Sequence, residues 1–184
     1  VLSKSIYGIE LQEGAAKLAA FSLALAICDA LQPNVIWEEL KFDSILNKNI
    51  LVGDFYEQHQ YIVKNTENAR GFDYIIGNPP FKSELTESMV EFVKSQKVQI
   101  PDNQIAYFIF FLCLQHLLNI DGKVSLLQPS GFLYNDGVSK FRTNIISKYC
   151  IEGILDFISI RGLFEGADTK VVAVQASRQS PRPD

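Results

Sequence analysis

Short segments rich in β-branched and aromatic residues alternate along this chain with longer helical segments, and this alternation constrains the fold more than any other feature. We expect strands at residues 5–11, 50–53, 72–77, 123–128, 152–158 and 170–175, and helices at 12–31, 104–119 and 135–148. Strands that alternate with helices of this length indicate βαβ units joined by right-handed crossovers. The sequence therefore predicts an α/β fold with a mostly parallel sheet and helices on both of its faces.

The size and composition of the chain indicate one globular domain inside a cell. Its 184 residues are 47% hydrophobic, which is enough to bury a single core. The most apolar segment, 105–118, is shorter than the roughly 20 residues that a membrane span needs, so we interpret it as a buried helix. The three cysteines are too scattered for a disulfide framework or a metal site, and no secretory signal opens the sequence. We therefore expect a cytoplasmic protein with no bound metal and no membrane segment.

Polar residues or prolines stand at the carboxyl ends of four of the expected strands. They are Glu10, the pair Asp54-Phe55, the run Asn78-Pro79-Pro80-Phe81, and the run Pro129-Ser130-Gly131. Because parallel strands present their carboxyl ends at one edge of a sheet, and ligands bind outside that edge, these groups should converge. The sequence therefore predicts one binding crevice built from the ends of these strands.

The run from Asn78 to Phe81 suits a particular ligand. Pro79 and Pro80 have no N–H, so the turn offers carbonyl oxygens with no competing donors, and Asn78 is pushed towards an extended conformation. The Asn78 amide oxygen and the Pro79 carbonyl can accept both hydrogens of an amino group on a flat ring that stacks on Phe81. This arrangement draws the nitrogen towards tetrahedral geometry and localises its lone pair. A turn that merely caps a strand is the alternative interpretation.

The sequence FDYIIGNPPF resembles motif IV, the catalytic motif of the S-adenosylmethionine-dependent amino-methyltransferases of DNA. Asn-Pro-Pro-Phe is typical of their adenine-N6 class, and the resemblance extends over residues 6–174. It implies a Rossmann-like methyltransferase sheet and methyl transfer from S-adenosylmethionine to N6 of adenine, in a restriction–modification enzyme of a bacterial or archaeal cell. It also implies that Asn78, Pro79, Pro80 and Phe81 are the catalytic residues.

The resemblance assigns further roles to the other strand ends. Glu10 corresponds to the residue that binds the cofactor ribose, and Asp54 to the one that binds the adenine amino group, with Phe55 packed on the adenine ring. Pro129 and Phe132 correspond to a segment that walls the target-base pocket. Two other interpretations stay open, since Glu10 could be a charge favoured at a helix N-terminus and Asp54 could be a loop cap.

One part of the family pattern is not found. The first strand and glycine-rich loop, which hold the methionine portion of the cofactor, would precede Ile6, where only five residues stand. We therefore expect residues 1–176 to be a partial methyltransferase domain whose first strand is missing, and 177–184 to be a disordered tail. Such a chain alone should bind S-adenosylmethionine weakly and be inactive.

The partner implied by the resemblance is double-stranded DNA. The net charge of −4 gives no basic surface, so we expect a recognition domain outside this chain to contact the phosphates. The target adenine would be extruded from the duplex, and residues 82–102, which we expect to form a mobile excursion, are placed to close over it.

Two other functions remain open at this point. Enzymes with an Asn-Pro-Pro signature also methylate a glutamine amide of a translation factor or a base of RNA, because those groups are planar and carry N–H donors. The long segment after Phe81 favours DNA over both. The third possibility is a non-catalytic scaffold, which the intact run from Asn78 to Phe81 disfavours.

Overall fold

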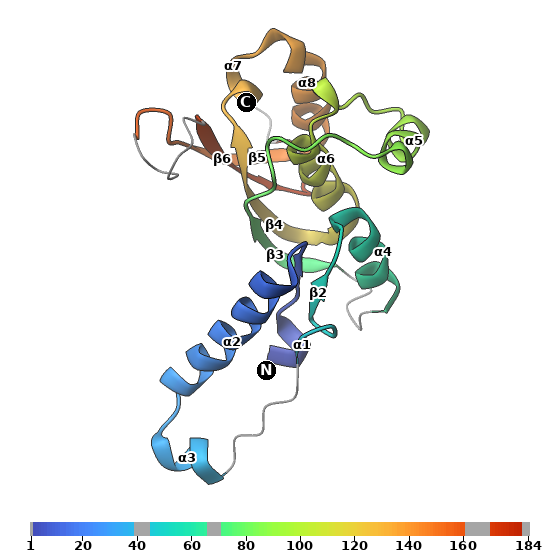
Figure 1. The fold of residues 1–184 in the computed structure, drawn as a ribbon. Coiled ribbons are helices and arrows are strands. Elements are labelled where there is room, and N and C mark those ends of the chain that lie inside the picture. The colour runs from blue at the N-terminus through green and yellow to red at the C-terminus, as the bar shows by residue number, and fades with distance from the viewer. Residues whose placement is uncertain (1, 39–44, 66–70, 161–169, 182–184) are drawn as a thin grey trace. The chain divides into compact units, whose positions relative to one another are not determined.

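The structure is a computed structural model that describes residues 2–38, 45–65, 71–160 and 170–181 (Figure 1). The chain divides into two compact units, Val1–Thr66 and Glu67–Asp184. Each of these units has a sheet of its own. The four strand ends that were predicted to converge therefore belong to two different sheets, two in each.

The first unit is built on a two-stranded parallel sheet. Strand β1 (Gly8–Glu10) pairs with β2 (Ile50–Val52), and Glu10 lies opposite Val52 at the carboxyl end of both. The described helices of this unit are α1 (Leu2–Ser5), α2 (Glu13–Asp29), α3 (Pro33–Glu38) and α4 (Phe55–Asn65). Helix α2 confirms the helix predicted over 12–31, whereas the strand predicted over 5–11 is shorter and follows a helical turn.

The second unit contains a mixed sheet rather than the mostly parallel one that we predicted. Its strands lie in the order β3 (Phe72–Gly77), β4 (Leu118–Pro129), β6 (Val171–Ser177) and β5 (Cys150–Asp156). Strand β3 is parallel to β4, but β6 is antiparallel to both of its neighbours. The prediction was wrong for β6 because an antiparallel strand needs no helical crossover, and no helical pattern precedes it in the sequence.

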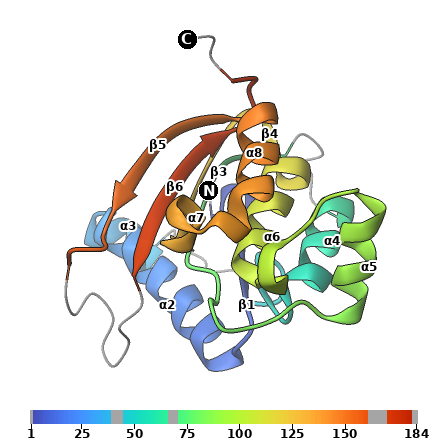
Figure 2. The same cartoon turned by 90° about the horizontal axis from the view of Figure 1, so that it is seen from above.

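Helices cover one face of this sheet. Helix α6 (Ile105–Leu112) continues as a π-helical turn, and α7 (Gly131–Tyr134) and α8 (Ser139–Lys148) follow β4; Figure 2 shows α6 and α8 on the same side of the strands. On the other face, Tyr74 and Ile76 of β3 are exposed. Among the described residues of this unit, helices on both faces, as we predicted, are not found.

Helix α6 is the centre of the core. All of its residues are buried, as expected for the apolar segment, and the ring of Phe110 meets Phe132 edge-on at 6.0 Å between centroids. Tyr107 of the same helix packs on Phe141 of α8 at 5.5 Å. No helix in the described part of the chain has the length and apolar character to cross a membrane.

The segment between the motif and α6 is packed, which corrects the expected mobile excursion over 82–102. It contains helix α5 (Glu87–Ser95), in which Met89 and Val93 are buried. Phe92 of α5 meets Phe108 of α6 edge-on at 6.3 Å. Because these apolar side chains hold α5 against the core, the interpretation of this segment as a lid loses its support.

The C-terminal tail also begins later than we expected. Ser177 is the last residue of β6, and the Cys150 N–H donates to the Gln179 carbonyl at 2.9 Å. The Arg178 guanidinium donates to the Leu118 carbonyl at 3.0 Å. Residues 178 and 179 are thus tied to neighbouring strands, and the last three residues of the predicted tail lie outside the described residues.

Strand β4 runs through Asp121 and Gly122, ahead of the strand that we expected at 123–128, and its register to β3 shifts there. A Cβ on Gly122 would lie 2.4 Å from the Phe72 carbonyl oxygen. We expect Gly122→Ala to lower the free energy of unfolding by about 1–3 kcal/mol, because backbone must move to admit the methyl group.

Urea unfolding followed by circular dichroism measures this effect. Gly14→Ala is the matched control, since nothing lies within 4 Å of a Cβ at that position on α2. The control should be neutral or should stabilise by up to about 1 kcal/mol. Equal stability of the two variants would contradict the close approach of β3 and β4.

Candidate active site

The predicted catalytic run lies directly beyond the carboxyl end of β3. Asn78 and Pro80 are exposed, Phe81 is half-buried, and Pro79 is buried between them. The side chain of Asn78 makes no hydrogen bond to any described residue. A buried proline thus anchors the turn, and the amide next to it is open to solvent.

The chain that leaves this turn is fastened to the start of α6. The Gln104 side-chain Nε2 donates to the Phe81 carbonyl at 3.0 Å, and the Ile105 N–H donates to the Ser83 carbonyl at 3.3 Å. The Leu85 N–H donates to the Asn103 carbonyl at 3.0 Å. Sequence analysis missed Gln104, since nothing in the local pattern places it beside a residue 23 positions earlier.

The Pro129 segment lies at the same edge of the sheet as the catalytic run. Strands β3 and β4 are parallel, and Gly77 lies opposite Leu126, so both strands end in the same direction. Pro129 is half-buried, and the next residue, Ser130, donates its N–H to the Lys170 carbonyl at 3.0 Å. These two strand ends therefore lie at one edge of the sheet of the second unit.

Phe132 lies behind this edge and not on it. Its exposed fraction is 1%, and its ring contacts Tyr107 at 6.2 Å as well as Phe110. A side chain buried to this extent belongs to the core, so its position does not favour the predicted contact with a target base.

Arg142 holds the segment around Phe132, and the ring of Tyr107 packs against the Phe132 ring. The Arg142 guanidinium donates to the Phe132 carbonyl at 2.7 Å. Burial raises the pKa of Tyr107 to about 12; the Asp102 carboxylate adds to this rise and Arg142 opposes it. Tyr107 therefore stays a neutral phenol near pH 7 and has no role there as a base.

The carboxylates predicted to bind the cofactor lie together in the first unit. Glu10 ends β1, and its carbonyl accepts the N–H of Gly53 at 3.0 Å, one residue before Asp54. Gly53 has a φ of 144°, and a Cβ there would lie 2.7 Å from the Gln58 side chain. Glycine therefore permits the turn that carries the chain from β2 to Asp54.

Both carboxylates also accept hydrogen bonds from the local backbone, and for Asp54 this is the loop cap of the alternative interpretation. Asp54 Oδ1 accepts the N–H groups of Tyr56 at 2.8 Å and Glu57 at 3.3 Å, which makes Asp54 the N-cap of α4. Glu10 Oε1 accepts the N–H of Gln12 at 2.9 Å before α2. Each carboxylate uses one oxygen in this way, so the second remains available to a ligand.

The ring of Phe55 packs against the ring of His59 in the same helix. The rings of Phe55 and His59 are stacked, with centroids 6.1 Å apart and planes 9° apart. His59 is 5% exposed and also packs on Tyr56. The spacing of four residues on one helix face was the available signal for the Phe55–His59 pair.

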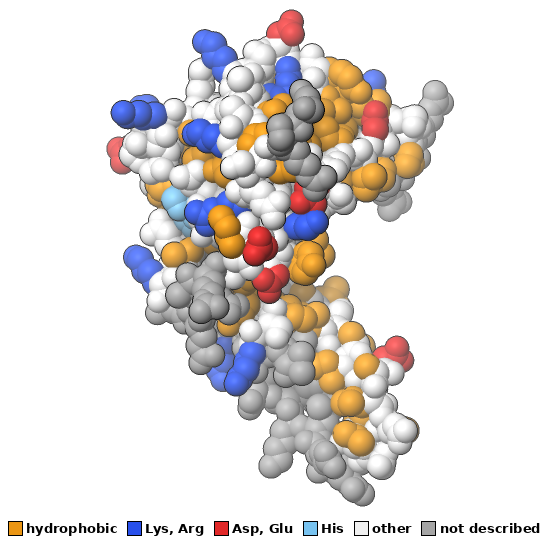
Figure 3. Space-filling view, turned by 180° about the vertical axis from the view of Figure 1, so that it is seen from behind, with side chains coloured by type: hydrophobic (Ala, Val, Ile, Leu, Met, Phe, Trp, Pro, Cys, Tyr) orange, Lys and Arg blue, Asp and Glu red, His pale blue; other side chains and the backbone are white. Residues whose placement is uncertain are grey.

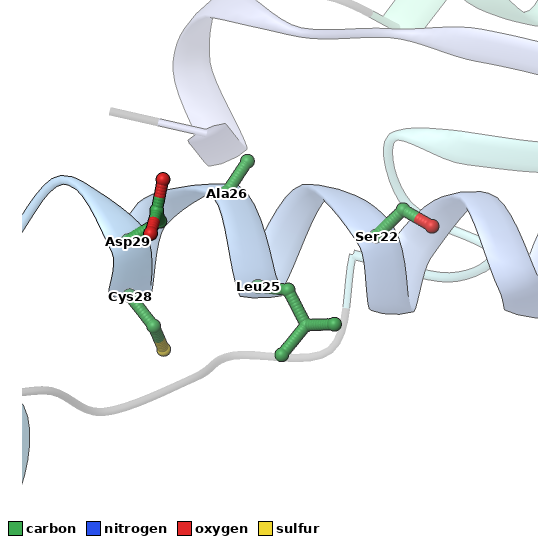
Figure 4. A pocket seen from close by; sticks show the side chains of 5 residues that line it. All are labelled: Ser22, Leu25, Ala26, Cys28 and Asp29. Atoms are coloured by element: carbon green, nitrogen blue, oxygen red, sulfur yellow. The ribbon is translucent and has the colours of Figure 1, made fainter.

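The strand ends thus form two pairs, one in each unit. Glu10 and Asp54 with Phe55 belong to Val1–Thr66, and Asn78–Phe81 with Pro129 belong to Glu67–Asp184. A separate hollow along α2 is lined by Ser22, Leu25, Ala26, Cys28 and Asp29 and includes none of these residues (Figure 4). No cluster of three or more potential metal ligands occurs among the residues that the structure describes.

Comparison with solved structures identifies the class of fold. The crystal structure of the type I restriction enzyme EcoKI M protein matches 95% of this chain and 31% of that chain, with a TM-score of 0.60 and 16% sequence identity. This chain therefore shares its fold with part of that protein. The match extends across both units.

Comparison with protein families is more specific. A sequence model of the Eco57I restriction-modification methylase family matches residues 4–164, and the chain belongs to this family. The type II restriction enzyme and methyltransferase RM.Eco57I of Escherichia coli is 23% identical over 175 residues. The match covers 85% of this chain and 17% of that relative, so the chain spans about a sixth of the relative's length.

The capping role of Asp54 is testable by stability measurements. Asp54→Ala should lower the free energy of unfolding by about 1 kcal/mol, because the N–H groups of Tyr56 and Glu57 lose their acceptor. Asp54→Asn should stay within about 0.5 kcal/mol of the parent, because asparagine caps a helix as well as aspartate does. Urea denaturation of both variants measures the difference, and equal losses would refute the capping role.

Proposed function

We propose that this chain belongs to an enzyme that transfers a methyl group from S-adenosylmethionine to N6 of adenine in DNA, within a restriction–modification system. The observation that carries the proposal is the Asn-Pro-Pro-Phe turn at the end of β3, with Asn78 open to solvent and Pro79 anchored in the core. Membership of the restriction-modification methylase family supports a DNA substrate over RNA or protein.

The turn acts by accepting hydrogen bonds. The Asn78 side-chain oxygen and the Pro79 carbonyl accept both hydrogens of the adenine amino group, while the base stacks on Phe81. The nitrogen lone pair, which is otherwise delocalised into the ring, becomes available for attack. The extra proton leaves the nitrogen for water afterwards, so no general base is needed, and positioning contributes up to about 7–11 kcal/mol.

The residues of the first unit fit the adenosine part of S-adenosylmethionine. The second carboxylate oxygen of Glu10 suits the ribose hydroxyls, that of Asp54 suits the adenine amino group, and the half-buried Phe55 ring suits the adenine face. When bound, the cofactor supplies a methyl group attached to a positively charged sulfur. Asp54 and Glu10 are held by their backbone contacts before any ligand arrives.

DNA binding requires more than this chain. The adenine must leave the duplex to reach the turn, because its amino group is inaccessible in the stacked helix. The net charge is −4, and Figure 3 shows basic and acidic side chains interspersed on the face it displays. We therefore propose that a recognition domain outside these residues contacts the DNA phosphates.

Methyl transfer by the full-length gene product tests the proposed function. Asn78→Ala should lower kcat for DNA methylation at least about 100-fold without a change in melting temperature, because Asn78 is exposed and the turn loses an acceptor. Labelled S-adenosylmethionine is supplied with DNA, RNA or a translation release factor as substrate. Asn34→Ala, at an exposed position on α3, is the matched control and should retain full activity.

Labelling of RNA or the release factor in place of DNA would move the assignment to another enzyme of this signature. Survival of DNA methylation in Asn78→Ala would refute the catalytic role of the turn.

Cofactor affinity tests the first unit. Glu10→Gln should raise the Kd for S-adenosylhomocysteine about 10-fold or more, because a charge-assisted hydrogen bond contributes about 1.5–3 kcal/mol. Glu13→Gln is the control, since Glu13 is exposed and pairs with Lys17 at 2.7 Å. Calorimetric titration of the full-length protein measures both, and an unchanged Kd for Glu10→Gln would remove Glu10 from the cofactor site.

A further inference from the structure

We propose that Gln104 is a positioning residue for the catalytic turn, and that its side-chain amide sets where Phe81 and Asn78 stand. The inference rests on the proposed function, because it concerns the same turn. The contact that carries it is the hydrogen bond from Gln104 Nε2 to the Phe81 carbonyl at 3.0 Å.

The turn needs support from outside because of its own composition. Pro79 and Pro80 have no N–H, so two successive residues of the run cannot donate a backbone hydrogen bond that would hold it. Among the described residues, the carbonyl of Phe81 is the first backbone group after the prolines that makes a hydrogen bond, and its partner is a side chain from another element. Gln104 supplies the donor that the prolines lack.

The local role of Gln104 in its helix points the same way. Gln104 is the N-cap of α6, with φ −77° and ψ 121°, yet its side chain makes no capping hydrogen bond. Serine, threonine, aspartate and asparagine cap helices better than glutamine does. Glutamine is thus a poor N-cap for α6, and its longer side chain reaches the Phe81 carbonyl instead.

The donor stands on a rigid support. Gln128 of β4 is fully buried, and its side-chain amide donates to the Ala106 carbonyl in the first turn of α6 at 3.3 Å. The backbone hydrogen bonds from Leu85 to Asn103 and from Ile105 to Ser83 hold the neighbouring chain on both sides of Gln104. A shift of the turn relative to α6 is therefore resisted at several points, of which Gln104 is nearest to the catalytic run.

Two substitutions separate positioning from stability. Gln104→Glu keeps the length of the side chain but removes the N–H donor and places a carboxylate oxygen against the Phe81 carbonyl. Gln104→Ser provides a better N-cap for α6 but is too short to reach Phe81. A purely structural role predicts that Gln104→Ser is harmless, whereas a positioning role predicts that both variants are impaired.

The kinetic measurement uses the full-length gene product with DNA and S-adenosylmethionine. Both variants should lower kcat for DNA methylation about 10- to 100-fold, because small displacements of reacting groups have effects of this size. The KM for the cofactor should stay within about threefold, since Glu10 and Asp54 are untouched, and Gln104→Ser should melt at or above the parent temperature. Gln99→Glu, the same substitution at an exposed position in the same connection, is the control and should keep full kcat.

The structural measurement is independent of activity. Amide hydrogen exchange of Leu85 and Ile105 should accelerate at least about 10-fold in both Gln104 variants, because these amides donate the backbone hydrogen bonds on either side of Gln104. Exchange at both amides should stay unchanged in Gln99→Glu. The proposal is overturned if kcat of Gln104→Ser stays within about threefold of the parent, or if the exchange rates do not change. Failure of the parent protein to methylate DNA refutes the proposed function, and the exchange rates then still decide whether Gln104 holds the turn.

Discussion

The burial of helix α6 is the constraint on which the second unit depends. Each fully buried phenylalanine of this helix contributes about 1.5–3 kcal/mol, and Phe108 and Phe110 also make edge-on contacts to α5 and α7. The same helix joins the sheet through Gln128 and meets α8 through Tyr107. Because its first turn stands at the edge where β3 and β4 end, the core and the catalytic turn share one support.

Glu10 and Asp54 of the candidate site have a structural role in addition to the proposed role in cofactor binding. Asp54 caps α4 with one oxygen and Glu10 accepts from the chain before α2 with one oxygen. This double use keeps each carboxylate in place before a ligand binds, so less conformational entropy is lost on binding. The two interpretations that the sequence left open for these residues are therefore compatible.

The parallel pairing of β3 and β4 is the part of the predicted sheet that the structure retains beside the candidate site. Strand β6 is antiparallel between β4 and β5, but β3 and β4 remain parallel, and only the latter pair brings Asn78 and Pro129 to one edge. A mixed sheet can therefore carry a site that was predicted from a parallel one. The convergence of these two strand ends requires only that β3 and β4 are parallel.

The amino-acid sequence by itself determined the features that depend on neighbouring residues. Strand β3 has the bounds that its apolar run predicted, and α2 follows its helical pattern. The lack of N–H groups at Pro79 and Pro80 follows from the residue types alone. Only the tertiary structure decided that β6 is antiparallel, that Phe132 lies in the core, that residues 178 and 179 are held, and that Gln104 reaches Phe81. The physical reason is that strand pairing, burial and side-chain hydrogen bonds join residues far apart in the chain. The local periodicity of the sequence does not predict such contacts.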